Sequence, residues 1–548
     1  MNPSSTPWNE LRAVLAEPSS SNFRERVLRS MLRDAENNVH ALDAEMAALS
    51  RRREQEQARI TSLKDALAPF RKLPTELAVK IFSEVEHGPQ WPARRENEFF
   101  RVLNTLSLVC SHWRAIILDD RNLWAQDAIC LLSARATTSY VDMVERILQR
   151  SAPRPVAISL GESSFAHSWS GAPSGPSLSK LLTVVARAAP RWRSFACRLN
   201  AHRTMSDRIW QLLSNTERWS HLQNLELTNA LDRNSTSRTR IFLDAPALHR
   251  ALIHATATWQ VPVLPWGQLQ DLTLNITELG STAQNREALE IIALCPFLVA
   301  LNIKLYTWKQ LENQDTGLPD VTLMHLGKLR LEVTTEIRIP DLVEDPLLTV
   351  APFFTRFTFP VLRTISIDMP EDYSPDPASI IDISLGMEFI SFLGRSSQLE
   401  SLALSFCLLD PDFLRDILAN TPSLTKLSIK YPLNELDDTL FEHLTYSPSR
   451  SVVAPKLHTL CLLRIGKQFT AKALVKLIHS RWWTDGAPMP VARWQHVSVF
   501  CRDDDEGPAG LYDLEVDFKE TVLALRDQGL RLETNFPPPW SQWDYDND

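Results

Sequence analysis

The sequence offers few side chains at spacings that could catalyse a reaction. It contains no HExxH pair for zinc, no GxSxG elbow for a nucleophilic serine, and no GxxxxGK[ST] or GxGxxG loop for phosphates. Cys110, His112 and Trp113 stand close together and suggest a thiol beside a base, but a helix that packs its apolar side explains them better. We therefore expect a protein that is not an enzyme and that needs no metal or organic cofactor.

Acidic residues gather toward the carboxyl terminus. Residues 501–548 hold 13 Asp and Glu against 4 Lys and Arg, and the net charge of the whole chain is -8. The run from Asp503 to Glu506 could hold a cation or a basic partner, although consecutive carboxylates are more often a solvated flank. An acidic chain without a basic stripe repels phosphates, so we expect no nucleic-acid partner.

The cysteines and the apolar segments indicate where the chain resides. Its 7 cysteines are scattered and include no CxxC pair, which argues against a disulfide framework and a zinc site. The longest apolar run, Ile291 to Leu301, contains Pro296 and is far shorter than the ~20 residues of a bilayer-spanning helix. The first residues lack the pattern of a secretory signal. We expect a cytoplasmic and/or nuclear protein without a membrane partner.

Residues 24–71, after a polar leader (1–23), predict a long helix. Arg53 and Glu56 interrupt a seam of apolar residues that recur at steps of three and four, namely Leu28, Leu32, Ala35, Val39, Leu42, Met46, Leu49, Ile60, Leu63, Leu67 and Phe70. Such a seam forms one stripe that another helix must cover. Either a second copy covers it, giving a coiled-coil homodimer through residues 28–70, or the helix folds back on its own chain.

Residues 72–128 predict a small helical unit. Leu73 and Pro74 open its first helix, because proline is tolerated in a first turn and Glu76 faces the positive end of the helix dipole. A second helix is predicted at Phe99 to Leu103. A third is expected to carry on one side Leu106, Val109, Cys110, Trp113, Ile116 and Ile117. Three short helices cannot cover this many apolar side chains, so we expect an exposed apolar face that meets another protein.

The segments LPTELAVKIFSEV and LSLVCSHWRAIILDDRNLW resemble an F-box in the order of their Leu-Pro, Ile-Phe, Val-Cys-x-x-Trp and Leu-Trp anchors. The resemblance implies binding to the Skp-type adaptor, and through it to the cullin, of a ubiquitin ligase. The residues implied in or beside that interface are Leu73, Pro74, Leu77, Ile81, Val109, Cys110, Trp113, Leu123 and Trp124. The same residues could instead form the unit's own core or dock on the following domain.

A triplet of apolar residues with spacing three then two recurs ten times between residues 192 and 499. The triplets begin at Trp192, Leu222, Leu269, Leu298, Leu326, Leu362, Leu399, Leu424, Leu457 and Trp494. The alternation at the last two positions is typical of a short strand. The repeat from Leu399 reads LxxLxLxxCxL, which is the signature of a leucine-rich repeat.

Helical stretches such as Ala288 to Leu294, Met387 to Leu393 and Phe413 to Leu418 lie between the triplets. We therefore predict an irregular leucine-rich-repeat-like α/β solenoid over residues 191–500, with insertions at Ala230 to Trp266 and Pro370 to Ile380. The alternative is an all-helical repeat of the HEAT type.

Two flanking regions complete the predicted organisation. Residues 129–190 should hold connecting helices and a first irregular repeat, with a strand at Val156 to Leu160 and a flexible loop at Gly161 to Ser177. Residues 501–548 should form an acidic C-terminal helix, from Leu511 to Arg526, and a tail with Trp540 and Trp543. The predicted fold class is thus α/β, with an N-terminal coiled-coil helix, a small three-helix F-box and the solenoid.

This layout resembles F-box-like proteins with leucine-rich-repeat-like C-terminal regions, which form large families in mushroom-forming fungi. The resemblance implies a substrate-recognition subunit of an SCF-type cullin RING ubiquitin ligase. The solenoid would bind an unknown protein target for ubiquitin-dependent degradation. The alternative function is a non-degradative scaffold built from the repeats and the coiled coil.

Overall fold

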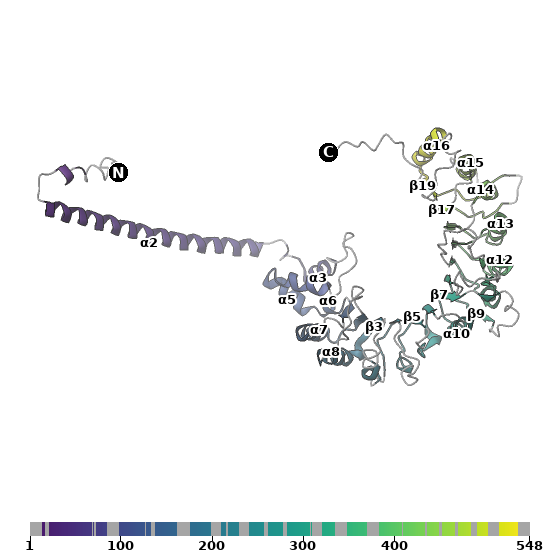
Figure 1. Ribbon diagram of the computed structural model, residues 1–548, viewed down its shortest axis with the longest axis horizontal. Helices are drawn as coiled ribbons and strands as arrows, with labels where there is room; N and C mark the ends of the chain where they lie inside the picture. The colour runs from purple at the N-terminus through teal and green to yellow at the C-terminus, as the bar shows by residue number, and fades with distance from the viewer. Residues whose placement is uncertain are drawn as a thin grey trace, which may run out of the picture. The chain divides into compact units, whose positions relative to one another are not determined.

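The computed structural model divides into two compact units (Figure 1). Unit 1 comprises residues 1–92 and 102–120, and unit 2 comprises residues 93–101 and 121–548. The structure describes residues 12, 14–16, 21–67, 70, 73–84, 98–126, 128–132, 137–161, 176–198, 210–214, 218–228, 240–256, 261–277, 282–306, 308–309, 320–334, 348–369, 383–407, 409–432, 436–448, 452–465, 469–483, 490–501 and 515–534. Outside them lie the acidic run Asp503 to Glu506, the segment Pro370 to Ile380, most of Gly161 to Ser177, and the tail tryptophans Trp540 and Trp543.

Unit 1 contains the long helix α2 (Ser21–Leu67), whose 47 residues include neither glycine nor proline. The predicted long helix is therefore confirmed. Its apolar seam faces solvent, with Leu42 60%, Met46 67% and Leu63 55% exposed. No described segment of unit 1 covers the seam, and both predicted alternatives, a second copy of the chain or the rest of the same chain, stay predictions.

Three short helices follow, α3 (Thr75–Glu84), α4 (Glu98–Ser107) and α5 (Ser111–Asp119), and the boundary between the units falls within α4. The predicted third helix was placed too early, because Leu106 belongs to α4 and Val109 lies in the turn that follows. The Val109 N–H donates to the Leu106 carbonyl at 3.2 Å. Cys110 then caps α5, with its Sγ accepting the Trp113 N–H at 3.5 Å.

Unit 2 is built on one sheet of fourteen strands in which all neighbours are parallel. In sheet order the strands are β1 (Ala128–Leu132), β2 (Val156–Gly161), β3 (Trp192–Arg198), β4 (Asn224–Thr228), β5 (Arg250–Thr256), β6 (Asp271–Thr277), β7 (Ala300–Tyr306), β10 (Lys328–Thr334), β13 (Thr364–Asp368), β15 (Ser401–Ser405), β16 (Lys426–Lys430), β17 (Thr459–Ile465), β18 (His496–Cys501) and β19 (Arg531–Thr534). Two small sheets join β8 (Trp308–Lys309), β11 (Leu348–Thr349) and β14 (Ile383–Ser384), and β9 (Val321–Thr322) with β12 (Phe357–Thr358).

Helices connect the parallel strands of unit 2, and Figure 1 shows them along one side of the sheet. They are α7 (Thr138–Ser151), α8 (Pro176–Arg187), α10 (Thr282–Ala293), α11 (Ala351–Arg356), α12 (Gly386–Gly394), α13 (Pro411–Ala419), α14 (Asp438–Leu444), α15 (Ala471–Ser480) and α16 (Glu515–Asp527), and α6 (Arg121–Ala125) precedes β1. The predicted helices at 288–294, 387–393 and 413–418 are confirmed within α10, α12 and α13. Parallel neighbours require such crossover connections, since a tight hairpin joins only antiparallel strands.

The ten predicted triplets mark the buried register of the sheet. Their second and third residues lie in strands and pair directly with their counterparts, as Leu402 does with Leu427 and Leu404 with Ile429. Each residue of the ten triplets is at most 2% exposed. The HEAT-type alternative is therefore wrong, because these residues line strands and not helices.

The sheet extends beyond the predicted repeats. The segment Ala230 to Trp266, expected to be an insertion, contains strand β5, in which Ala251 pairs with Leu225 and Leu272. Ala251 occupies the second position of a triplet, where the sequence pattern looked for a large apolar residue. This repeat was therefore not recognised from the sequence. The predicted strand at Val156 to Leu160 is confirmed as β2. Strand β19 follows α16 in a region where only a helix and a tail were expected.

Three arginines, of which Arg481 is buried, tie successive turns of unit 2 together through backbone carbonyls. Arg481, at the end of α15, is 1% exposed and donates to the carbonyl oxygens of Leu444 (3.2 Å), Val453 (2.8 Å), Ala454 (3.0 Å) and Leu457 (3.4 Å). Burial lowers its pKa to about 10. Arg191 and Arg395 bind carbonyls of earlier segments in the same way. These bonds satisfy backbone acceptors that would otherwise be buried without a donor.

Candidate functional site

Helix α3 carries apolar residues on two faces. Ala78 and Phe82 are each 1% exposed, whereas Leu77 is 48% and Ile81 44% exposed. Both pairs are four residues apart, and one pair is displaced from the other by about 100° around the helix axis. Burial of a leucine or isoleucine side chain is worth about 1.5–3 kcal/mol, so the exposed face of α3 is a surface that a partner can stabilise.

The start of α3 is set by the residues before it. The Pro74 carbonyl accepts the N–H groups of Leu77 and Ala78, each at 3.1 Å, and the proline ring supplies the φ angle that a first turn requires. Pro74 is itself exposed and Leu73 is half-buried. The Leu-Pro pair therefore begins the helix next to its exposed apolar face.

An aromatic cluster fixes the buried face of α3 against α5. The ring centroids lie 5.7 Å apart for Phe70 and Phe82, 4.7 Å for Phe70 and Trp113, and 5.1 Å for Phe82 and Trp113. Trp113 remains half-buried. Cys110 acts here as a helix cap, since its sulfur accepts the Trp113 N–H. Cys110 and Trp113 thus take part in capping α5 and in packing it against α3.

The turn between α4 and α5 adds further exposed apolar side chains. Leu108 and Val109 are both exposed, and the Arg114 guanidinium donates to the Ser107 carbonyl at 3.0 Å across the turn. This bond holds the turn in place. Of the nine residues expected to face an adaptor, Pro74, Leu77, Ile81 and Val109 are exposed, and Leu73, Cys110 and Trp113 are half-buried.

Leu123 and Trp124 lie elsewhere, in the core of unit 2. Each is 1% exposed. The Trp124 ring stacks near Phe100, with 6.4 Å between centroids, and Arg150 lies 4.5 Å above its face. Because these two residues are buried by their own chain, they offer no surface to an adaptor in this structure. For these two residues the alternative prediction, that they dock on the following domain, describes the structure better than the adaptor-facing one.

Several cysteine side chains of unit 2 are buried by their own chain. Burial raises the pKa of Cys197 and Cys407, and raises that of Cys295 to about 12, so these sulfurs stay protonated. The described part of the chain brings together no group of three or more His, Cys, Asp or Glu that could hold a metal ion. None of its described helices combines the length and apolar character that crossing a bilayer requires.

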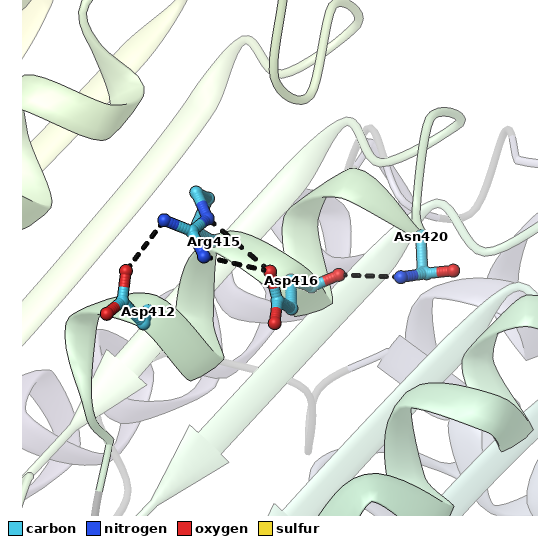
Figure 2. Close-up of polar contacts among 4 residues, drawn as sticks. All are labelled: Asp412, Arg415, Asp416 and Asn420. Carbon is cyan, nitrogen blue, oxygen red and sulfur yellow. Dashed lines mark hydrogen bonds and ion pairs between the residues drawn. The ribbon is translucent and has the colours of Figure 1, made fainter.

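The charged side chains of a cluster on α13 pair within their own helix (Figure 2). Arg415 pairs with Asp412 at 2.7 Å and with Asp416 at 3.4 Å. Asn420, at the end of the helix, donates to the Asp416 carbonyl at 2.9 Å. Such contacts stabilise a helix surface and already engage the Arg415 guanidinium.

A cavity of about 180 Å³ lies near this helix and is lined by residues that include Arg415, His443, Tyr446 and Arg481. The Arg481 guanidinium is already bound to backbone carbonyls. The cavity is smaller than the ~300 Å³ at which ligand pockets usually begin. We therefore regard the exposed apolar surface of α3 and the α4–α5 turn as the candidate site.

Comparisons with known proteins agree with this location. Residues 70–129 match the F-box-like family, and this range includes all nine expected adaptor-facing residues. No curated protein matches the chain. Among solved structures, the chain is similar to the one titled "Crystal structure of TLR13-ssRNA13 complex", at 12% identity and a TM-score of 0.25, over 59% of this chain and 48% of that one. It thus spans about half of that chain's length, and a score this low establishes no common fold.

Proposed function

We propose that the chain is the substrate-recognition subunit of an SCF-type cullin RING ubiquitin ligase. The observation that carries this proposal is the exposed apolar face of α3, formed by Leu77 and Ile81 within the segment that matches the F-box-like family. F-box segments bind Skp-type adaptors, and an apolar helix face of this kind is suited to a hydrophobic groove on a partner. The adaptor would in turn link the chain to the cullin.

The proposed adaptor surface consists of Leu73, Pro74, Leu77, Ile81, Val109, Cys110 and Trp113. The exposed members would contact the adaptor directly, and the half-buried Trp113 and Cys110 would hold α5 in position. Leu123 and Trp124 are set aside because unit 2 buries them.

The proposed target-binding region is the fourteen-stranded sheet, which we interpret as an irregular leucine-rich-repeat-like solenoid. Its in-register triplets and its alternation of strand and helix support this interpretation. A stack of parallel strands presents a broad face on which a protein target can lie. The described cysteines are free thiols, which fits the proposed cytoplasmic or nuclear location.

The proposed mechanism involves no bond chemistry by this chain. The sheet would hold the target while the adaptor connects it to a catalytic subunit, which raises the effective concentration of ubiquitin conjugate at the target's lysines. We also propose that a second copy of the chain covers the exposed seam of α2, giving a homodimer through residues 28–70.

The test is co-purification of the full chain with a Skp-type adaptor and cullin. We expect Leu77→Asp combined with Ile81→Asp to abolish recovery of both, because two carboxylates would be buried against apolar groups. Met387→Asp is a matched control, since Met387 is 65% exposed on α12 in unit 2 and should not affect recovery. A wild-type chain that recovers neither adaptor nor cullin would favour the non-degradative scaffold.

A further inference from the structure

The open face of the sheet, opposite the helices, changes its charge pattern along the strands. From β3 to β13, acidic side chains meet basic ones of nearby strands, in the pairs Arg198–Glu226, Arg250–Asp271 at 2.6 Å, Lys304–Glu332 at 2.6 Å and Arg330–Asp368 at 3.0 Å. The charges of these pairs largely neutralise one another. This part of the face therefore has little net attraction for a charged partner.

Strand β16 differs, because both of its charged side chains are lysines. Lys426 and Lys430 point to the open face, since Leu427 and Ile429 between them belong to the buried register. Neither lysine forms an ion pair with a described residue. Their direct neighbours on the adjacent strands are all uncharged, namely Ser401, Ser405, Thr459 and Leu463.

An aromatic ladder borders these lysines at the carboxyl ends of β15, β16 and β17. It consists of the two aromatic rings of Phe406 and Tyr431 and of the guanidinium of Arg464, which lies near the second ring. The Phe406 and Tyr431 rings stack at 4.8 Å with an interplanar angle of 10°, and the Arg464 guanidinium lies 5.9 Å from the Tyr431 ring. All three side chains are half-buried.

The backbone of the aromatic ladder is held in the left-handed region, with φ of 55° at Phe406, 48° at Tyr431 and 56° at Arg464. The Phe406 N–H donates to the Lys430 carbonyl at 3.0 Å, and the Tyr431 N–H to the Leu463 carbonyl at 2.9 Å. Glycine would adopt this backbone with less strain. Bulky side chains at three successive positions of this kind point to a role for the side chains themselves.

We propose that strands β15–β17 bind an acidic segment of a protein target. Its aspartate or glutamate side chains would pair with Lys426 and Lys430, and an aromatic side chain of the segment would pack on the aromatic ladder. This inference rests on the proposed function as a substrate receptor and names the chemical class of its target. The charge complementarity of the two lysines selects an acidic partner over a neutral or basic one.

The test measures fluorescence anisotropy of a labelled glutamate decapeptide with one central tryptophan, titrated with the full chain. Lys426→Glu combined with Lys430→Glu should weaken binding at least about tenfold, because attraction becomes repulsion at two positions. Phe406→Ala combined with Tyr431→Ala should weaken it about fivefold. Lys328→Glu is the matched control, an exposed lysine on β10, and should change binding less than about twofold.

Several outcomes would overturn this proposal. They are equal binding of a lysine decapeptide, insensitivity to the double lysine reversal in a chain that melts normally, and tighter binding of a single-stranded RNA decamer. A further variant changes Asp503, Asp504 and Asp505 to Asn and Glu506 to Gln. If the glutamate peptide binds only to this variant, the natural occupant of the site is the chain's own acidic run and not a separate target. Co-purification of the adaptor with the same variants tests the proposed function separately. A failure to recover the adaptor can therefore be told apart from a failure to bind the peptide.

A second, independent observation concerns the exposed seam of α2. Arg53 and Glu56 interrupt this seam, and both are exposed. In a parallel pair of helices in register, each would face its own counterpart, which places Arg against Arg and Glu against Glu. Like charges at a helix interface are destabilising.

An antiparallel pair centred between Arg53 and Glu56 removes this conflict. Each Arg53 then faces Glu56 of the second copy. Moving outward from the centre, apolar residues face apolar ones, in the pairs Leu49–Ile60, Met46–Leu63 and Leu42–Leu67. All six are exposed in the single chain. At the flanks Asp43 meets Lys64, which is favourable, and Arg52 meets Arg59, which is not.

We infer that the second copy proposed to cover α2 lies antiparallel to it, with this register. Shifting the helices by one heptad would set the two charged residues against apolar ones, so the charge match selects the register. The orientation would place the F-box-like segments at opposite ends of the shared helix pair.

Disulfide cross-linking of the full chain tests the orientation. Leu49→Cys combined with Ile60→Cys should form a cross-linked dimer under mild oxidation, whereas Leu49→Cys alone should not. Cross-linking by Leu49→Cys alone would indicate parallel helices and overturn the inference. Arg53→Glu should also reduce the dimer seen in sedimentation, and Arg53→Glu with Glu56→Arg should restore it. A wild-type chain that sediments only as a monomer would contradict the inference.

Discussion

Helix α3 and strand β15 place similar aliphatic residues in opposite environments. Leu77 and Ile81 of α3 are 48% and 44% exposed, whereas Leu402 and Leu404 of β15 are fully buried. The difference follows from what each element can pack against. A strand in a stack of repeats is covered by the helices of its own chain, while α3 has only the short helical part of unit 1 to pack against. The comparison shows that unit 2 buries these leucines within itself, whereas α3 leaves two apolar side chains exposed.

The largest expected effect contrasts the same substitution in the two places. Leu402→Asp should destabilise unit 2 by at least about 4 kcal/mol, because it buries a charge without a partner. Leu77→Asp should change stability by less than about 0.5 kcal/mol, since the site is open to water. Chemical denaturation followed by circular dichroism measures both. Equal losses of stability would contradict the comparison.

A smaller effect is expected at Arg481, which satisfies backbone carbonyls inside unit 2. Arg481→Leu leaves these acceptors without donors and should reduce stability by about 3 kcal/mol. Arg415→Leu is the control, because that arginine makes only exposed contacts within its own helix (Figure 2) and should lose less than about 0.5 kcal/mol. Similar denaturation midpoints for the two variants would mean that the buried bonds add little to stability.

The smallest effect is expected at the last strand. Hydrogen bonds from Arg531 and Ser498 lower the pKa of Glu533, whose ordinary value is 4.5. A carboxylate with a lowered folded-state pKa stabilises the fold above its ordinary pKa, and this contribution is lost as pH falls through the folded-state pKa. Between about pH 3 and pH 6 the wild-type chain should therefore lose more stability on acidification than Glu533→Gln does. Parallel pH profiles for the two would rule out this contribution of β19.

Much of this architecture follows from patterns along the chain. The triplets predicted strands because the spacing of three then two matches a bend followed by alternation, and each triplet is buried as expected. Strand β5 was missed because Ala251 is too small to stand out, although its neighbours Leu225 and Leu272 complete the register. The long helix was predictable since its seam repeats over many turns.

Other features depend on contacts that no local pattern encodes. Leu123 and Trp124 follow the helical unit in sequence, yet Trp124 packs against Phe100 and Arg150 in unit 2. The carbonyl contacts of Arg481 join segments from residue 444 to residue 481, which become neighbours only in the folded chain. The stacking of Phe406 and Tyr431 likewise depends on the pairing of β15 with β16.

The central claim is that a second protein covers the exposed apolar face of α3. Hydrogen–deuterium exchange of the full chain, with and without a purified Skp-type adaptor, tests it most directly. The account predicts slower exchange of the amides in residues 75–84 and around Val109 when the adaptor is added, with no change in strands β15–β17. Unchanged exchange in α3 at saturating adaptor, or protection confined to the sheet, would contradict it.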